Sequence, residues 1–254
     1  MCIIAYKPAG TAFPSWDIME NCFENNPDGA GFMYADEDGV HVHKGYMSWD
    51  SFEEAIKPHV KNSAKYPFVL HFRITTHGGT KPEMTQPFPL SSDAKKLKKL
   101  DSHCHIGVAH NGIIPMTSYA RKLSDTALFI KDYLTLLINN NPKYYKDSRI
   151  ADMVEELISS KMCILSNDGH AEILGSGWKE DNGIMYSNNT YSYSKWDNWK
   201  GYYKKVDKYD GWWYDDEKAD EELQYDWSVY CHYSETNSTE LCEGCKNERY
   251  CFGY

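Results

Sequence analysis

The expected strands and helices of this chain come in blocks rather than in strict strand–helix alternation. The expected strands lie at 2–6, 31–35, 40–44, 67–75, 105–109, 161–166 and 171–174, and the expected helices at 15–23, 48–60, 124–139 and 150–159. Ser15 and Ser124 are placed to cap two of the helices. An order of this kind favours an α+β fold, in which helices cover two sheets, over a parallel sheet built from βαβ units.

Length and composition describe a globular protein. The chain has 254 residues, of which 41% are hydrophobic and 25% charged, so a sizeable core is available and neither wholesale disorder nor a membrane class fits. The net charge of -10 argues against binding to nucleic acid or to acidic lipid as the main activity. Neither a signal peptide nor an apolar run of about 20 residues is evident, and we expect a cytoplasmic protein.

The composition changes near residue 191, and the sequence predicts a domain at 2–190 and an extension at 191–254. Five of the eight tryptophans lie in this extension, among tyrosines and acidic residues. So many aromatic rings are too apolar for a disordered tail, so we expect the extension to wrap the domain or to meet a partner. Within the domain, the glycines and prolines of 77–90 predict a long irregular loop, and the lysines of 95–99 a solvated face.

Methionine aminopeptidases remove Met1 when the second residue is small, as cysteine is. Cys2 would then be the N-terminal residue and would carry two chemical groups. Its thiol is a strong nucleophile, and its free α-amine would titrate at about 7.7 to 8.0, close to the working pH of a general base. Taken alone, a cysteine at this position is more often a small apolar residue at the start of a strand.

Four further residues carry groups that acyl transfer from an amino-acid substrate requires. The Asn111 amide and the Gly112 N–H follow an apolar strand and could donate to one developing oxyanion, although Asn-Gly is also an ordinary turn sequence. Arg73 at a strand end and Asp125 at a helix start could hold the carboxylate and ammonium of an amino-acid substrate.

The order of these motifs resembles the class II glutamine amidotransferases, which are N-terminal-nucleophile hydrolases, and in particular their stand-alone branch. The resemblance covers roughly residues 2–190. It rests on Cys2-Ile3-Ile4, Asp28-Gly29-Ala30-Gly31-Phe32, His71-Phe72-Arg73-Ile74-Thr75-Thr76-His77-Gly78, Gln86-Pro87-Phe88, His110-Asn111-Gly112-Ile113-Ile114 and Ser124-Asp125-Thr126. Several ordered matches are far more specific than any single motif.

The resemblance implies a four-layer αββα sandwich with Cys2 between the sheets. It implies that Cys2 attacks the side-chain amide of glutamine, and that its own amine passes a proton to the departing ammonia. The oxyanion hole would consist of Asn111 and Gly112. The residues implied for binding the α-carboxylate and α-ammonium of glutamine are Arg73 with Thr76 and His77, and Asp125.

Two features depart from the family pattern. Gln86 stands where the family often has histidine, which bears on the packing of its loop and on substrate choice. If Met1 stays attached, Cys2 has no free amine and the mechanism above cannot operate.

Four cysteines near the C-terminus predict a structural zinc site. Cys231, Cys242, Cys245 and Cys251 contain a Cys-x2-Cys pair, which presents two thiolates to one tetrahedral ion. The alternative is a set of reduced or partly disulfide-bonded thiols. The pairs His41/His43 and His103/His105 lack a local third ligand, which favours ordinary histidines over metal sites.

The sequence therefore predicts a glutaminase domain that needs no organic cofactor. No phosphate-binding glycine loop is evident, and the roughly 60 residues of the extension are too few for a synthetase, so the ammonia would pass to a separate partner enzyme or be released. Two alternatives remain: an amidohydrolase acting on another γ-glutamyl amide, and a catalytically silent interaction module with a zinc-bound tail.

Overall fold

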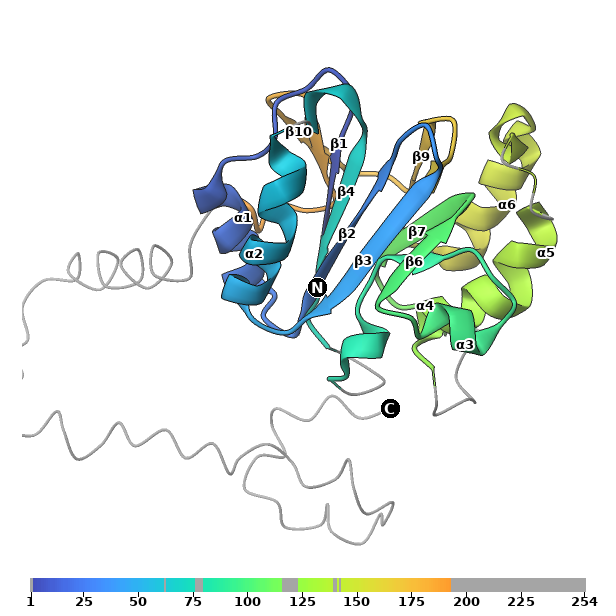
Figure 1. Ribbon diagram of the computed structural model, residues 1–254. Helices are drawn as coiled ribbons and strands as arrows, with labels where there is room; N and C mark the ends of the chain where they lie inside the picture. Colours follow the sequence, from blue (N-terminus) through green and yellow to red (C-terminus); the bar gives the residue numbers. More distant parts are fainter. Residues whose placement is uncertain are drawn as a thin grey trace, which may run out of the picture. The chain divides into compact units, whose positions relative to one another are not determined.

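Two antiparallel β-sheets form the centre of the fold (Figure 1). The computed structural model describes residues 2–61, 63–75, 80–115, 123–138, 141 and 143–192. Within these residues, the seven-stranded sheet has the order β10-β11-β1-β4-β2-β3-β6, and the four-stranded sheet has the order β5-β7-β8-β9.

The seven-stranded sheet places the start of β1 in its interior, because β11 and β4 pair with β1 on either side. Its strands are β1 (Ile3–Lys7), β2 (Ala30–Ala35), β3 (Val40–Tyr46), β4 (Phe68–Phe72), β6 (Asp101–Cys104), β10 (Lys179–Asp181) and β11 (Ile184–Tyr186). The register aligns Ile3 with Phe72, so the residues just before β1 and just after β4 lie side by side.

The four-stranded sheet carries β7 between β5 and β8. Its strands are β5 (Phe88–Pro89), β7 (Ile106–Asn111), β8 (Lys161–Ser166) and β9 (Ala171–Leu174). Asn111 pairs with Lys161, which sets the end of β7 beside the start of β8.

Helices cover the outer face of each sheet. They are α1 (Trp16–Asn25), α2 (Trp49–Val60), α3 (Ala94–Leu97), α4 (Asp125–Phe129), α5 (Thr135–Ile138) and α6 (Ser148–Ile158). A π-helical segment, Ile130–Leu134, joins α4 to α5. Figure 1 shows α1 and α2 on one side of the sheets and α4 to α6 on the other.

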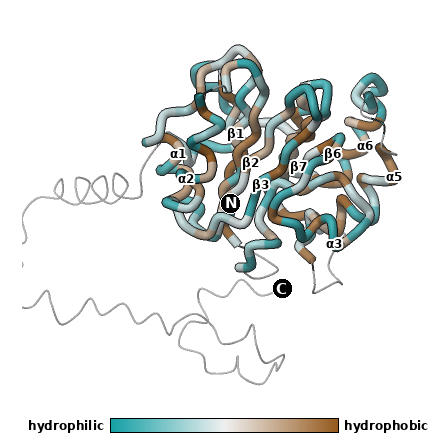
Figure 2. The backbone as a smooth tube through the Cα atoms, viewed as in Figure 1, coloured by the Kyte–Doolittle hydropathy of each residue, from teal (hydrophilic) through white to brown (hydrophobic). Residues whose placement is uncertain are grey.

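The period-two alternation of the strands divides the core into three apolar layers. On β1, Ile3 packs with the residues of α1 and α2, whereas Ile4 packs between the sheets. On β8, Cys163 belongs to the layer between the sheets and Ile164 to the layer under α4 and α6. The described residues therefore form four layers in the order helices, sheet, sheet, helices. Figure 2 shows that hydrophobic segments run along the strands.

The α+β class expected from the sequence is confirmed, as are two of its helix caps. The Ser15 side chain accepts from the Ile18 N–H, and the Ser124 side chain accepts from the Ala127 N–H. The expectation that 77–90 contains no regular structure was wrong within its described part. Pro82–Met84 forms a 3-10 turn and β5 pairs with β7, because proline tolerates the first turn of a helix and an edge strand.

The expected elements also missed three short strands, β6, β10 and β11. None of them shows a long alternating pattern, and each pairs with a partner distant in sequence or lies at an edge. In the part of the chain that the structure describes, no helix combines the length and apolarity needed to cross a bilayer.

Candidate active site

Cys2 lies immediately before β1 and opens onto a cavity. Its half-buried thiol Sγ donates to the Ile74 carbonyl oxygen at 3.5 Å. Its own carbonyl oxygen accepts from Asn188 Nδ2 at 2.7 Å. The thiol is thus tied to the residues that follow β4, and the backbone to the residues that follow β11.

The cavity has a volume of about 370 Å³ and joins residues from both sheets. Cys2 and Ile74 contribute from the ends of β1 and β4, and Asn111 and Gly112 from the end of β7. The remaining described lining residues are Ile113, Ser159, Ser160, Lys161, Ser187 and Asn188. The nucleophile and the two oxyanion-hole candidates expected from the sequence therefore face one space.

Gly112 is required by two features of the backbone. Its φ is +151°, and a Cβ added there would lie 2.4 Å from Cβ of Ser160. The absence of a side chain lets the backbone turn after β7 directly against the start of β8. Asn111 and Gly112, the residues at this turn, both line the cavity.

Arg73 follows β4, and only 5% of its surface is exposed. Its N–H donates to the Gly29 carbonyl at 2.8 Å and its carbonyl accepts from the Asp28 N–H at 2.9 Å, so the Asp-Gly turn holds its backbone. Burial lowers the pKa of the guanidinium, and the negative charges that Cys2, Asp28 and Asp125 carry when they are ionised oppose this shift. Arg73 is therefore within electrostatic reach of both Cys2 and Asp125.

Asp125 occupies the first turn of α4. Its Oδ2 accepts from the Ile114 N–H at 2.9 Å and its Oδ1 from the Thr126 N–H at 2.8 Å. These bonds tie the segment after Gly112 to the helix start. Neither Asp125 nor Arg73 belongs to the described lining of the Cys2 cavity.

A buried polar network surrounds His110, the residue that precedes Asn111 and Gly112. His110 Nδ1 is 3.0 Å from Thr126 Oγ1, and His110 Nε2 is 2.7 Å from Ser160 Oγ. The Gln86 side chain accepts from the His110 N–H at 2.7 Å. Burial lowers the pKa of His110 to about 4, so the imidazole is neutral at physiological pH. Gln86, the departure from the family pattern, thus supports the strand that carries Asn111.

A second histidine completes this support. His71 on β4 lies with its Nε2 3.1 Å from the His110 carbonyl oxygen and donates to it across the two sheets. Burial lowers the pKa of His71 to about 3, which also keeps this ring neutral. The sheets are therefore joined by a hydrogen bond one residue before Asn111.

The Cys2 thiol is not pre-ionised by its surroundings. Burial raises its pKa, while the Ile74 hydrogen bond and the Arg73 charge act in the opposite direction. A thiol with a raised pKa needs a base to become a nucleophile at neutral pH. The fully buried Cys22 and Cys163 also have raised pKa values, but they are enclosed in the core.

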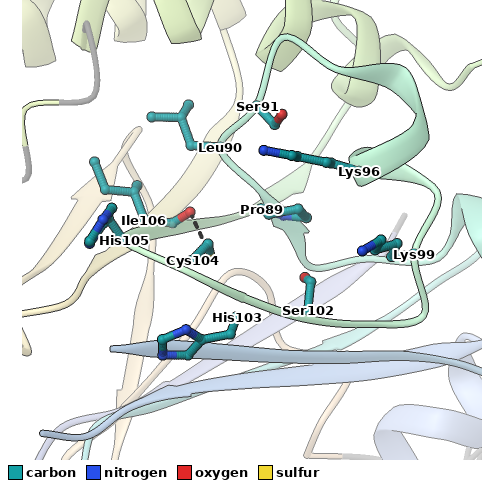
Figure 3. Close-up of a pocket in the computed structure, with 10 residues that line it drawn as sticks. All are labelled: Pro89, Leu90, Ser91, Lys96, Lys99, Ser102, His103, Cys104, His105 and Ile106. Carbon is teal, nitrogen blue, oxygen red and sulfur yellow. Dashed lines mark hydrogen bonds between the residues drawn. The ribbon is translucent and has the colours of Figure 1, made fainter. Parts of the chain in front are cut away.

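A second cavity, of about 360 Å³, lies between the β5 segment and β6 (Figure 3). Lys96, Lys99 and Ser102 contribute to its lining, and Cys104 Sγ donates to the Ile106 carbonyl oxygen at 3.2 Å. His103 and His105 also line it, whereas His41 and His43 bind Asp36 and Asp101 at 2.9 and 2.8 Å. No cluster of three metal-ligating side chains occurs among the described residues.

Several residues expected to function lie outside the described residues. They are Thr76 and His77, and the zinc candidates Cys231, Cys242, Cys245 and Cys251. Conversely, no motif in the sequence singled out Ser187, Asn188 or Lys161, which line the cavity. Ser187 and Asn188 follow the unpredicted β11, so their position opposite Asn111 depends on a strand pairing that is not visible locally.

Solved structures include distant structural neighbours of this chain. No family model matches the chain, and no curated protein matches it. A glutamine phosphoribosylpyrophosphate amidotransferase from B. subtilis, solved in complex with ADP and GMP, superposes with a TM-score of 0.43 and 14% identity. The superposition covers 75% of this chain and 42% of that chain, so the chain spans less than half of the neighbour's length. A similarity of this size carries no argument about function, which rests on the site itself.

Proposed function

We propose that this chain is a glutaminase-type amidohydrolase of the N-terminal-nucleophile kind, which cleaves the side-chain amide of glutamine through Cys2. The observation that carries the proposal is the single cavity shared by Cys2, Asn111 and Gly112. A nucleophile and two oxyanion donors around one space are what acyl transfer from an amide requires. The electrostatic reach of Arg73 to Cys2 and Asp125 also supports an amino-acid substrate.

The reaction proceeds in two halves. Cys2 Sγ attacks the amide carbon, and the carbonyl oxygen becomes an oxyanion bound by the Asn111 amide and the Gly112 N–H. The C–N bond then breaks, and the nitrogen leaves as ammonia with the proton that the Cys2 α-amine removed from the thiol. Water attacks the thioester, glutamate departs and the thiol is restored.

Residues outside the described cavity lining bind the substrate in this proposal. Arg73 binds the α-carboxylate of glutamine, with Thr76 and His77 assisting, and Asp125 binds its α-ammonium. Asp125 already accepts two backbone N–H groups, but carboxylate oxygens have further lone pairs for an ammonium. The ammonia passes to a partner synthase that is a separate chain.

One feature of the cavity favours a second candidate substrate class. Ser159, Ser160 and Lys161 also line a neighbouring cavity of about 360 Å³, together with Glu155, Gly175 and Ser176. Space beyond the Cys2 cavity would hold a leaving amine larger than ammonia. A γ-glutamyl amide with a substituted nitrogen is therefore the alternative substrate, cleaved by the same steps.

Intact mass before and after treatment with a diazoketone analogue of glutamine tests the proposal. The expected result is a chain that lacks Met1 and gains one adduct, with the adduct on Cys2. Cys104→Ala is the matched control and should label like the unaltered protein, because Cys104 lines the other cavity. A chain from its native host that keeps Met1 would contradict the mechanism. A processed chain that takes no label would favour the catalytically silent interaction module.

A further inference from the structure

Ser187 connects the nucleophile strand to Asn111. Its N–H donates to the Ile4 carbonyl at 2.9 Å, and its Oγ accepts from the Ile4 N–H at 2.8 Å. Ser187 thereby extends the pairing of β11 with β1 by one residue, and only 1% of its surface is exposed. Asn111 Nδ2 lies 2.9 Å from the same Oγ. One hydroxyl thus meets a backbone group of one sheet and a side chain of the other.

The Asn111 amide can face the Ser187 hydroxyl in two orientations, and these differ in which donors and acceptors are paired. The Ile4 N–H can only donate, so Ser187 Oγ must accept from it. With Nδ2 towards Ser187, the oxygen accepts a second time, and the buried Asn111 Oδ1 has no partner among the described residues. The hydroxyl hydrogen then has no acceptor there either.

Turning the amide by 180° satisfies both groups. The Ser187 hydroxyl then donates to Asn111 Oδ1 while it still accepts from the Ile4 N–H, and the two N–H groups of Nδ2 become the atoms without a protein partner. The turned amide leaves only its two N–H groups without a partner among the described residues, whereas the other orientation leaves the amide oxygen, the hydroxyl hydrogen and one N–H unpaired, so the turned amide satisfies more groups. Asn111 is one of the residues that line the cavity with Cys2, so the freed donors belong to a residue of that cavity.

We propose that Ser187 is a positioning residue that orients the Asn111 amide, so that Nδ2 rather than Oδ1 meets the oxyanion of a substrate attached to Cys2. This inference rests on the proposed function. Ser187 itself does not touch the reacting atoms; it acts through Asn111. Without its hydroxyl, Asn111 keeps its donors but loses the group that selects their direction, so the loss of rate should be smaller than for removal of Asn111.

The test compares Ser187→Ala, Ser187→Thr, Asn111→Ala and the Ser187→Ala/Asn111→Ala double variant in glutamine hydrolysis. We expect Ser187→Ala to lower kcat about tenfold with KM nearly unchanged, because the oxyanion contact is made in the transition state. Ser187→Thr keeps a hydroxyl and should restore most of the turnover. In the Asn111→Ala background, Ser187→Ala should have almost no further effect, because the two residues act as one unit.

Alkylation of Cys2 by iodoacetamide separates positioning from general damage. Displacement of iodide at a saturated carbon develops no oxyanion, so Ser187→Ala should be alkylated at the rate of the unaltered protein. Ser166→Ala is the matched control, because Ser166 is equally buried but lies at the far end of β8, and its kcat should not change.

Three results would overturn the inference while the proposed function stands: normal kcat in Ser187→Ala, losses that multiply in the double variant, or alkylation that falls in parallel with kcat. An unaltered, Met1-processed protein that releases no ammonia from glutamine would overturn the proposed function and this inference with it.

Discussion

The two sides of the Cys2 cavity are held in place differently. On the Cys2 side, the thiol makes one hydrogen bond of 3.5 Å and the backbone accepts one from Asn188. On the Asn111 side, the preceding residue His110 is bound through its N–H, its carbonyl and both ring nitrogens. An oxyanion donor acts best when it is fixed in advance, whereas a thiol that forms and breaks a bond needs freedom to move. The difference is what an acyl-transfer site requires of its two halves.

Removing the thiol should give the largest effect on turnover, and it should alter only the Cys2 side of the cavity. Cys2→Ala keeps a small second residue, so removal of Met1 continues and only the nucleophile is lost. Glutamine turnover should fall at least about a thousand-fold. The melting temperature should hardly change, because the thiol makes a single long hydrogen bond. Residual turnover close to that of the unaltered protein would show that Cys2 is not the nucleophile.

Asn111 and Arg73 should respond differently to the same truncation. Asn111→Ala should lower kcat by about a hundred-fold, since it removes a contact made in the transition state. Arg73→Ala, like Asp125→Ala, should mainly raise KM, because the α-groups of glutamine are bound in ground and transition state alike. Steady-state kinetics against glutamine separate the two patterns. If all three variants simply fail to fold, their roles reduce to packing.

The sequence predicted the elements with local signals and missed those defined by distant pairing. Ser15 and Ser124 were identifiable because a cap bonds within three residues of itself. Cys2, Asn111 and Gly112 stood out as chemical motifs, and the fold brings them to one cavity. Ser187 carries no local signal, since its partners Ile4 and Asn111 are 183 and 76 residues away. The same holds for Gln86, whose bond to His110 spans 24 residues.

Gln86 offers a way to weaken the Asn111 side without touching the cavity. Gln86→Leu keeps the size of the side chain but removes the acceptor for the buried His110 N–H. We expect the free energy of unfolding to fall by about 2 kcal/mol, the cost of an unsatisfied buried donor. Urea denaturation measures this loss. Lys81→Leu is a suitable control at an exposed site, and an equal loss there would contradict the role of the hydrogen bond.

The Asn111 side should also carry the pH dependence of stability. The folded-state pKa values of His71 and His110 are lowered to about 3 and about 4, below the value near 6.5 of the unfolded chain. Between pH 6.5 and 4 the unfolded state binds more protons, so stability falls as the pH is lowered through this window. Each histidine contributes up to about 1.4 kcal/mol per pH unit there. Urea midpoints at pH 7 and pH 5 should differ less in His110→Gln than in the unaltered protein. An equal difference would contradict this assignment.

Removal of zinc from the C-terminal cysteines should have the smallest effect on the reactivity of Cys2. Cys231, Cys242, Cys245 and Cys251 are predicted to bind one zinc ion, and four thiolates leave no open coordination position for a catalytic water. Chelation should therefore change protease sensitivity after residue 191 while Cys2 still reacts with the diazoketone. Elemental analysis of protein purified without chelator should give one zinc per chain, and Cys242→Ser with Cys245→Ser should abolish it. Absence of stoichiometric metal would refute the zinc site. Loss of Cys2 labelling after deletion of residues 228–254 would instead show that the extension helps to form the Cys2 side of the cavity.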